Sequence, residues 1–209
     1  VMSAQLLVAL GEERGVSRQQ LLHNSGISEE QLYNPETVVE AQSELTIVRN
    51  LIRALPNNPE LALHAGQRYQ LSTYGIWGFA IASSPNARQA IELARNFQEL
   101  TFVFAPFNIS MDREKTTIAF DDEGIPQDVQ RFCLERDMAA AAVILGELLG
   151  QPDAVEQIRF RHGPPPYLEE YRRAFPGKLH FNAGSNLFEI SNTVLDVPRV
   201  MGNASTANL

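Results

Sequence analysis

The side chains able to do chemistry are few and lie far apart in the sequence. The four histidines are His23, His64, His162 and His180. No two of them have the spacing that a metal site on a helix requires. The single cysteine, Cys133, follows Phe132 in a helical pattern, which indicates a buried and inert thiol. The chain contains no Gly-rich phosphate loop and no Gly-x-Ser-x-Gly nucleophile elbow. We therefore expect that this chain binds no metal ion and no cofactor, and that it is not an enzyme.

Two further groups of polar side chains leave alternatives open. The acidic run 121–123 lies at an expected strand-to-helix turn, where a solvated loop is a simpler reading than a carboxylate pair. His162 shares one strand face with Ile158 and Phe160 and precedes a proline run. It is either a histidine that hydrogen-bonds this connector or the one polar group of an apolar ligand pocket.

Tyr74 and Trp77 are spaced i, i+3, so they share one face of an expected helix and could supply the rest of such a pocket. Aromatic residues of the expected hairpin would lie nearby. The candidate ligand-binding residues are therefore Tyr74, Trp77, Phe104, Phe120 and His162.

The stretch Gly66–Asn86 contains the only tryptophan and an uncharged run from Thr73 to Ala82. Ten residues are too few to span a bilayer, which needs about 20. We expect a short helix inside the domain, whose glycines permit close approach of another backbone or of a ligand. A central packing helix and a helix that walls a ligand pocket both fit this pattern.

Composition limits the classes of partner. The chain has 209 residues, a net charge of −8 and a pI near 5.0. DNA affinity depends largely on Lys and Arg side chains that neutralise phosphates, so this segment is a poor candidate for holding DNA by itself. An N-terminal helix-turn-helix outline does not change this, because its second helix would present Glu29, Glu30 and Gln31. No signal peptide or membrane-length apolar run occurs, and we expect a cytoplasmic location.

Periodicity predicts an α+β fold. Apolar residues at helical spacing predict helices over most of residues 3–100, with N-caps at Ser17 and Ser28. Alternation then predicts a hairpin of strands near 102–107 and 116–120, and a long buried helix over 127–149. Strands over 156–162, 178–181 and 186–191 follow, with a short helix at 167–175. The expected architecture is a helical N-terminal half followed by a small, mostly antiparallel sheet packed by a long buried helix.

Several segments together resemble a known family. The run YGIWGFAIASSPNARQAIELARNF, the strand IRFRH and the ending LHFNAGSNLFEISNTVLDVPR are similar to the N-terminal effector-binding, arabinose-binding-type domain of AraC-family transcription regulators. The resemblance covers about Ser3 to Arg199. Trp77 stands where Leu is commoner in the family pattern, and no agreed ligand residues can be carried over because effectors differ within the family.

The resemblance implies a division of the chain and a function. Residues 1–197 would form the regulatory domain, helical over 1–100 and α+β over 101–197, and residues 198–209 a linker toward an absent C-terminal helix-turn-helix domain. We expect this domain to bind a small-molecule effector, to form a homodimer, or both, and so to control DNA binding by the absent domain. A ligand-free dimerisation module is the alternative. No membrane partner is expected.

Overall fold

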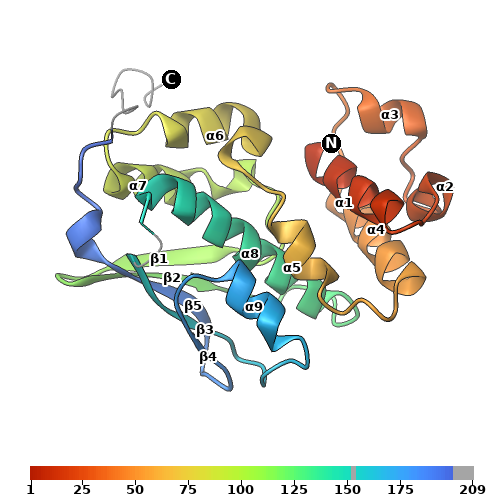
Figure 1. The fold of residues 1–209 in the computed structure, drawn as a ribbon. Helices are drawn as coiled ribbons and strands as arrows, with labels where there is room; N and C mark the ends of the chain where they lie inside the picture. The colour runs from red at the N-terminus through yellow and green to blue at the C-terminus, as the bar shows by residue number, and fades with distance from the viewer. Residues whose placement is uncertain (152–153, 200–209) are drawn as a thin grey trace.

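A helical N-terminal unit stands beside a sheet whose one face is covered by helices (Figure 1). The computed structural model describes residues 1–151 and 154–199. The N-terminal unit consists of α1 (Met2–Glu13), α2 (Arg18–Leu22), α3 (Glu29–Tyr33) and α4 (Ala41–Ala54). The helices around the sheet are α5 (Leu61–Gly66), α6 (Gly75–Ala82), α7 (Ala87–Asn96), α8 (Gln130–Leu149) and α9 (Leu168–Ala174).

The sheet has five strands in the order β1-β2-β5-β3-β4. Every neighbouring pair is antiparallel except β3 and β4, which confirms the predicted α+β class and the mostly antiparallel sheet. The strands are β1 (Phe107–Met111), β2 (Lys115–Phe120), β3 (Val155–Arg159), β4 (Lys178–His180) and β5 (Asn186–Ser191).

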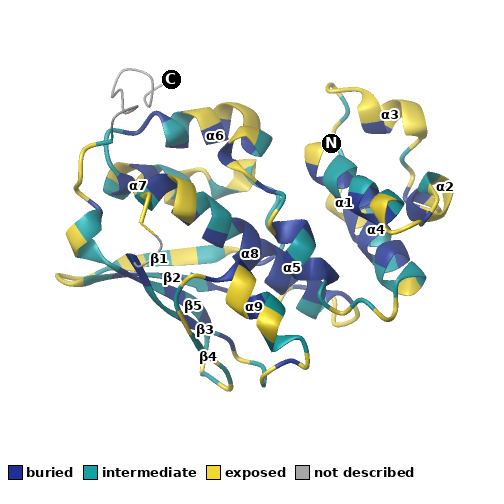
Figure 2. Cartoon of the chain, viewed as in Figure 1, coloured by how far each residue is buried: buried dark blue, intermediate teal, exposed yellow. Residues whose placement is uncertain are grey.

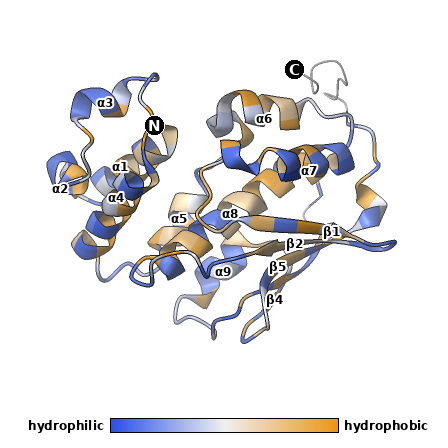
Figure 3. Cartoon of the chain, turned by 180° about the vertical axis from the view of Figure 1, so that it is seen from behind, coloured by the Kyte–Doolittle hydropathy of each residue, from blue (hydrophilic) through white to orange (hydrophobic). Residues whose placement is uncertain are grey.

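Within residues 1–151 and 154–199, helices cover only one face of the sheet. Burial alternates along β2 and β5, as expected for strands with one face in the core (Figure 2). Ile118 of β2 lies opposite Phe188 of β5, and both are buried. Figure 3 shows the sheet from behind, where no helix of the described residues lies in front of it.

Local capping explains the short N-terminal helices. The Ser17 and Ser28 side chains accept hydrogen bonds from the backbone N–H groups of Gln20 and Gln31, so both predicted N-caps are confirmed. Side chains of this kind satisfy donors that the helix cannot pair internally. They allow helices of one to two turns to pack on α1 and α4.

The first predicted strand was misplaced. The sequence pattern indicates a strand over 102–107, whereas β1 begins at Phe107. The Asp137 carboxylate accepts hydrogen bonds from the backbone N–H groups of Phe104 and Ala105, at 2.7 and 2.8 Å. These donors are therefore engaged by a side chain of α8 and not by a neighbouring strand.

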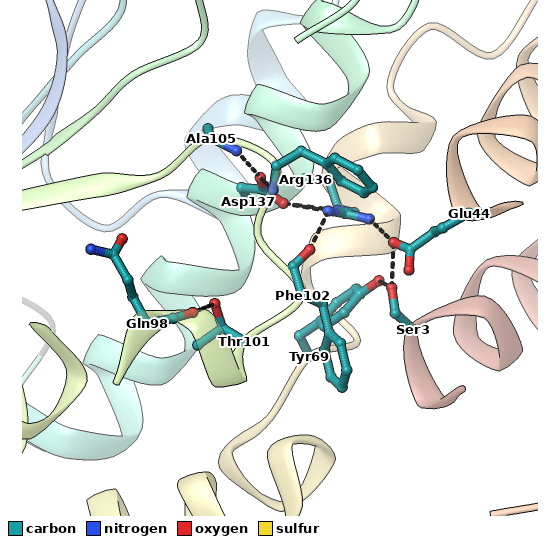
Figure 4. A network of polar contacts seen from close by, with 10 residues as sticks. Ser3, Glu44, Tyr69, Gln98, Thr101, Phe102, Ala105, Arg136 and Asp137 are labelled. Atoms are coloured by element: carbon teal, nitrogen blue, oxygen red, sulfur yellow. Dashed lines mark hydrogen bonds and ion pairs between the residues drawn. The ribbon is translucent and has the colours of Figure 1, made fainter. Parts of the chain in front are cut away.

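Helix α8 supplies a buried ionic network that joins the two halves of the chain (Figure 4). Arg136 is 1% exposed and donates to Asp137, to Glu44 of α4 at 2.5 Å and to the Phe102 carbonyl at 2.8 Å. The Ser3 hydroxyl of α1 donates to the same Glu44 oxygen at 2.6 Å. One guanidinium thus connects α4, α8 and the segment before β1, and through Glu44 it also reaches α1.

Close packing of α5 on α8 brings the network together. A Cβ at Gly66 would lie 2.4 Å from the Arg136 carbonyl oxygen, so no larger residue fits without movement of the backbone. Tyr69, just beyond α5, hydrogen-bonds Ser3 through its hydroxyl at 2.6 Å. None of the helices in the described ranges combines the length and apolar character needed to cross a membrane.

Replacing Arg136 is expected to destabilise the whole domain. Arg136→Met leaves the buried carboxylates of Glu44 and Asp137 without their cation, which costs about 3–5 kcal/mol in buried pairs. Urea unfolding should show a lower midpoint with one cooperative transition.

Arg172→Ala is the matched control, because it removes a 60% exposed arginine that pairs with Glu169. Exposed pairs contribute little, so this variant should unfold like the wild type. Equal midpoints for Arg136→Met and the wild type would contradict the structural role assigned to the network.

Candidate functional site

A small cavity lies between α6, α7, α8 and the hairpin of β1 and β2. Its volume is about 70 Å³. The lining is predominantly apolar and includes Tyr74, Trp77, Ile81, Ile91, Ala94, Thr101, Val103, Phe107, Ile109, Ile118, Phe120, Asp137, Ala141, Ile144, Leu145 and Leu148. Small-molecule sites commonly combine an apolar wall with a few placed polar groups, and this lining has that composition.

Trp77 contributes a polar group with no partner. The residue is 7% exposed, and its indole N–H is buried without a hydrogen-bond partner among the described residues. Buried donors are normally satisfied, so an unpaired one needs a specific explanation. A ligand acceptor is one such explanation, because Trp77 lines the cavity.

Tyr74 stands beside Trp77 in an aromatic group. Its ring stacks on Phe102 at a centroid distance of 5.1 Å and lies 5.1 Å from the indole of Trp77. Burial raises the pKa of the Tyr74 hydroxyl, so this group is a neutral phenol at physiological pH. Aromatic contacts of this kind hold the two rings together on the cavity lining.

Asp137 is the only charged residue on the lining, within the described residues. Burial raises the pKa of its carboxyl group, an effect opposed by Arg136 and by the backbone N–H groups of Ala105 and Phe104. One carboxylate oxygen accepts from Arg136 and the other from these two N–H groups. The carboxylate is therefore already paired within the protein.

Helix α6 forms an outer wall of the cavity. Trp77 and Ile81 line it, whereas Ile76 and Phe79 on the same helix are 83% and 58% exposed. The prediction that this helix lies inside the domain is therefore wrong for one of its faces. A Cβ at Gly78 would lie 1.7 Å from the Leu71 carbonyl oxygen, so this glycine permits the close backbone approach that the sequence predicted.

The structure brings three of the five candidate ligand residues together. Tyr74, Trp77 and Phe120 line the cavity. Phe104 lies elsewhere, with its ring centroid 5.2 Å from the Arg136 guanidinium carbon. His162 belongs to a separate cluster near α9, with its ring centroid 5.9 Å from that of Tyr171. It follows β3, which β5 separates from the hairpin of β1 and β2.

His162 hydrogen-bonds the connector that follows it. Its Nδ1 lies 2.8 Å from the Gly163 carbonyl oxygen, which matches the first of the two readings of this residue. Its Nε2 lies 3.2 Å from the hydroxyl of Tyr171, which in turn donates to the buried Glu135. Burial lowers the pKa of His162 to about 4, with a smaller opposing effect from the Gly163 carbonyl.

Sequence reasoning missed the residues that α8 contributes. Ala141, Ile144 and Leu148 line the cavity from one face of that helix. The adjacent charges Arg136 and Asp137 before an apolar run were a usable signal, since charges within a buried helix are rarely left unpaired. Among the described residues, no three His, Cys, Asp or Glu side chains gather closely enough to hold a metal.

Acidification is expected to destabilise the fold through His162. A histidine with a lower pKa in the folded state binds its proton more weakly there, so stability falls as pH drops from 6.5 toward about 4. Urea unfolding at about pH 7 and about pH 4.5 should show a smaller loss for His162→Gln than for the wild type.

The exposed His23 offers a control, because His23→Gln should keep the wild-type pH dependence. Burial raises the pKa of the neighbouring Glu135, so this group favours the folded state as the pH falls, opposite to His162. The wild type and both variants share this effect. An unchanged slope in His162→Gln would show that this histidine is not desolvated.

Comparison with known proteins agrees with this architecture. A family model described as the arabinose-binding domain of AraC transcription regulators, N-terminal, matches residues 15–199. Uncharacterized HTH-type transcriptional regulators of Mycobacterium bovis and Mycobacterium tuberculosis are each 30% identical over 139 residues, which is 66% of this chain and 40% of theirs.

Two proteins of Pseudomonas aeruginosa are also similar. The ornithine utilization regulator is 25% identical over 209 residues, all of this chain and 61% of that protein. The crystal structure of the transcriptional regulator CdpR has a TM-score of 0.61 at 18% identity, over 94% of this chain and 60% of that one, and this likeness shows the fold alone.

The chain thus spans 40% to 61% of the length of the curated relatives it matches. The resemblance read from the sequence is confirmed, since the family model covers most of the chain. The chain has a helical N-terminal half and a sheet covered by helices on one face, and the family model matches residues 15–199. This chain therefore belongs to the AraC-type transcription regulators, as the N-terminal domain that the family description calls arabinose-binding.

Proposed function

We propose that this domain is the sensor of a transcription regulator, which binds a small-molecule effector in the cavity beside α6. The supporting observation is the apolar cavity lined by Trp77, whose buried indole N–H has no partner among the described residues. Tyr74 and Phe120 complete the candidate site. Phe104 and His162 lie outside the cavity and have no ligand role in this proposal.

Control of DNA binding requires that the effector bind one state of the protein more tightly than another. Helix α6 could transmit this difference between the two states from the cavity to the rest of the protein. Arg199 donates to the Ile81 and Ala82 carbonyls at the end of α6, at 3.2 and 3.0 Å. Movement of α6 would therefore displace the segment that follows the sheet.

We propose that the conformational change on effector binding is transmitted to the chain that follows Arg199. Arg88 of α7 holds this segment from its other side, through two hydrogen bonds to the Asp196 carboxylate at 2.7 and 2.9 Å. The predicted linker is 198–209, of which residues 200–209 lie outside the described residues. We place DNA contact in a helix-turn-helix domain of the full regulator, and we assign no catalysis and no membrane partner to this domain.

Effector binding should change the fluorescence of Trp77, which is the sole tryptophan of the chain. We expect a metabolite library to yield at least one compound that shifts this emission and raises the melting temperature. Ala141→Leu fills the cavity from α8 and should abolish both responses.

Ala119→Leu is the matched control, because it adds the same atoms to β2 at a position between the buried Ile118 and Phe120, where the side chain faces away from the core. It should leave the response intact. A library that leaves emission and melting temperature unchanged in the wild type would count against a ligand role.

One observation favours a second function, pairing of two copies without a ligand. Ile76 and Phe79 lie on one face of α6 and are largely exposed. Exposed apolar patches often mark interaction sites. We propose this face as the contact between two copies of the chain, with each copy presenting the same residues to the other.

Sedimentation equilibrium tests this pairing. The wild type should dimerise with rising concentration, whereas Ile76→Lys combined with Phe79→Lys should remain a monomer because buried like charges oppose association. Val38→Lys is the control, since Val38 is exposed but lies outside α6. A wild type that stays monomeric at every concentration would exclude a dimerisation module.

A further inference from the structure

We infer that the cavity beside α6 accepts a neutral, mainly apolar molecule of about one ring in size that carries a hydrogen-bond acceptor. This inference rests on the proposed sensor function and narrows the chemistry of its effector. It differs from what the family description suggests, since that description refers to a sugar.

The lining offers too few polar groups for a sugar. Apart from Asp137, the lining side chains able to hydrogen-bond are Tyr74, Trp77 and Thr101. The Thr101 hydroxyl already donates to the Gln98 carbonyl at 2.6 Å. A buried sugar hydroxyl without a partner carries a desolvation cost, and a pentose brings several of them.

The lining also disfavours charged ligands. No Lys, Arg or His side chain lines the cavity within the described residues, so an anion would lack a countercharge there. Asp137 does not provide a site for a cation, because Arg136 and two backbone N–H groups occupy both its oxygens. Amines, amino acids and carboxylates are therefore expected to bind weakly.

Trp77 lines the cavity and its buried indole N–H has no partner among the described residues, so we assign the ligand's acceptor to this donor. Indole is a donor only, so the complementary ligand group is an oxygen such as that of a ketone, ester or amide. A pure hydrocarbon would fill the same space but leave the donor unsatisfied. The structure thus distinguishes two molecules of equal shape by one atom.

Cavity size limits the ligand and requires a moving wall. The volume of about 70 Å³ is near half that of the ~150 Å³ apolar cavity known to hold a benzene ring. Single-ring ligands therefore need an outward shift of one wall. Helix α6 is a wall whose outer side is open to solvent, because Ile76 and Phe79 are largely exposed.

Three molecules of nearly equal shape test the inference on the 209-residue chain. Acetophenone carries a neutral acceptor, α-methylstyrene replaces that oxygen by a methylene group, and benzoate adds a charge. Calorimetry should show acetophenone binding roughly three- to tenfold more tightly than α-methylstyrene, the range expected for one neutral hydrogen bond. Benzoate, L-arabinose and L-ornithine should bind at least tenfold more weakly than acetophenone, a difference of about 1.4 kcal/mol.

NMR provides a second measurement of the hydrogen bond between the ligand and the Trp77 indole N–H. The single tryptophan yields one indole N–H resonance. Acetophenone should move this resonance and slow its exchange with water, whereas α-methylstyrene should do so much less. Trp77→Phe keeps an aromatic ring but removes the donor, and it should bring the acetophenone to α-methylstyrene affinity ratio close to one. A ratio in Trp77→Phe equal to that of the wild type would overturn the assignment of the acceptor.

Failure of this inference is distinguishable from failure of the sensor function. Tighter binding of L-arabinose, L-ornithine or benzoate than of acetophenone, abolished by Ala141→Leu, would overturn the apolar ligand and leave the sensor in place. Absence of binding by all these probes, together with a silent metabolite library, would overturn both.

Discussion

The Arg136 guanidinium is the interaction on which the remaining structure depends. A fully buried cation is tolerated only when its charge and donors are matched, and here Glu44, Asp137 and the Phe102 carbonyl match them. The same contacts fix the position of α4 and of the segment before β1 relative to α8. Because Asp137 also holds two backbone N–H groups of that segment, the network determines where β1 begins.

The cavity follows from this arrangement together with the small residues of α8. The network anchors α8 near its middle, and the alanines beyond Asp137 leave space beside the sheet at Ala141. Tyr74 and Trp77 close that space from α6, whose outer face is left without cover in the described chain. The candidate site is therefore asymmetric, with the buried helix α8 on one side and the partly exposed helix α6 on the other.

The sequence predicted the elements with strong periodicity and part of the candidate site. The i, i+3 pair Tyr74 and Trp77 and the alternation through Phe120 depend on local pattern, and these residues do lie together at the cavity. Phe104 does not line the cavity, and its own backbone N–H donates to Asp137, a partner 33 residues away. His162 was grouped with the site by chemistry alone, whereas strand order sets its place, and strand order is not encoded in any local pattern.

The contact between Ser3 and Glu44, and through Glu44 to Arg136, bears on how this domain could be transplanted into chimeric regulators. The region shared with the family starts at residue 15, which suggests a natural cutting point. A graft made there would discard α1 and with it Ser3, leaving Glu44 and Tyr69 without their shared hydroxyl. The unit to transplant is therefore larger than the matched region, and it begins at α1 and includes Arg199, which hydrogen-bonds the end of α6.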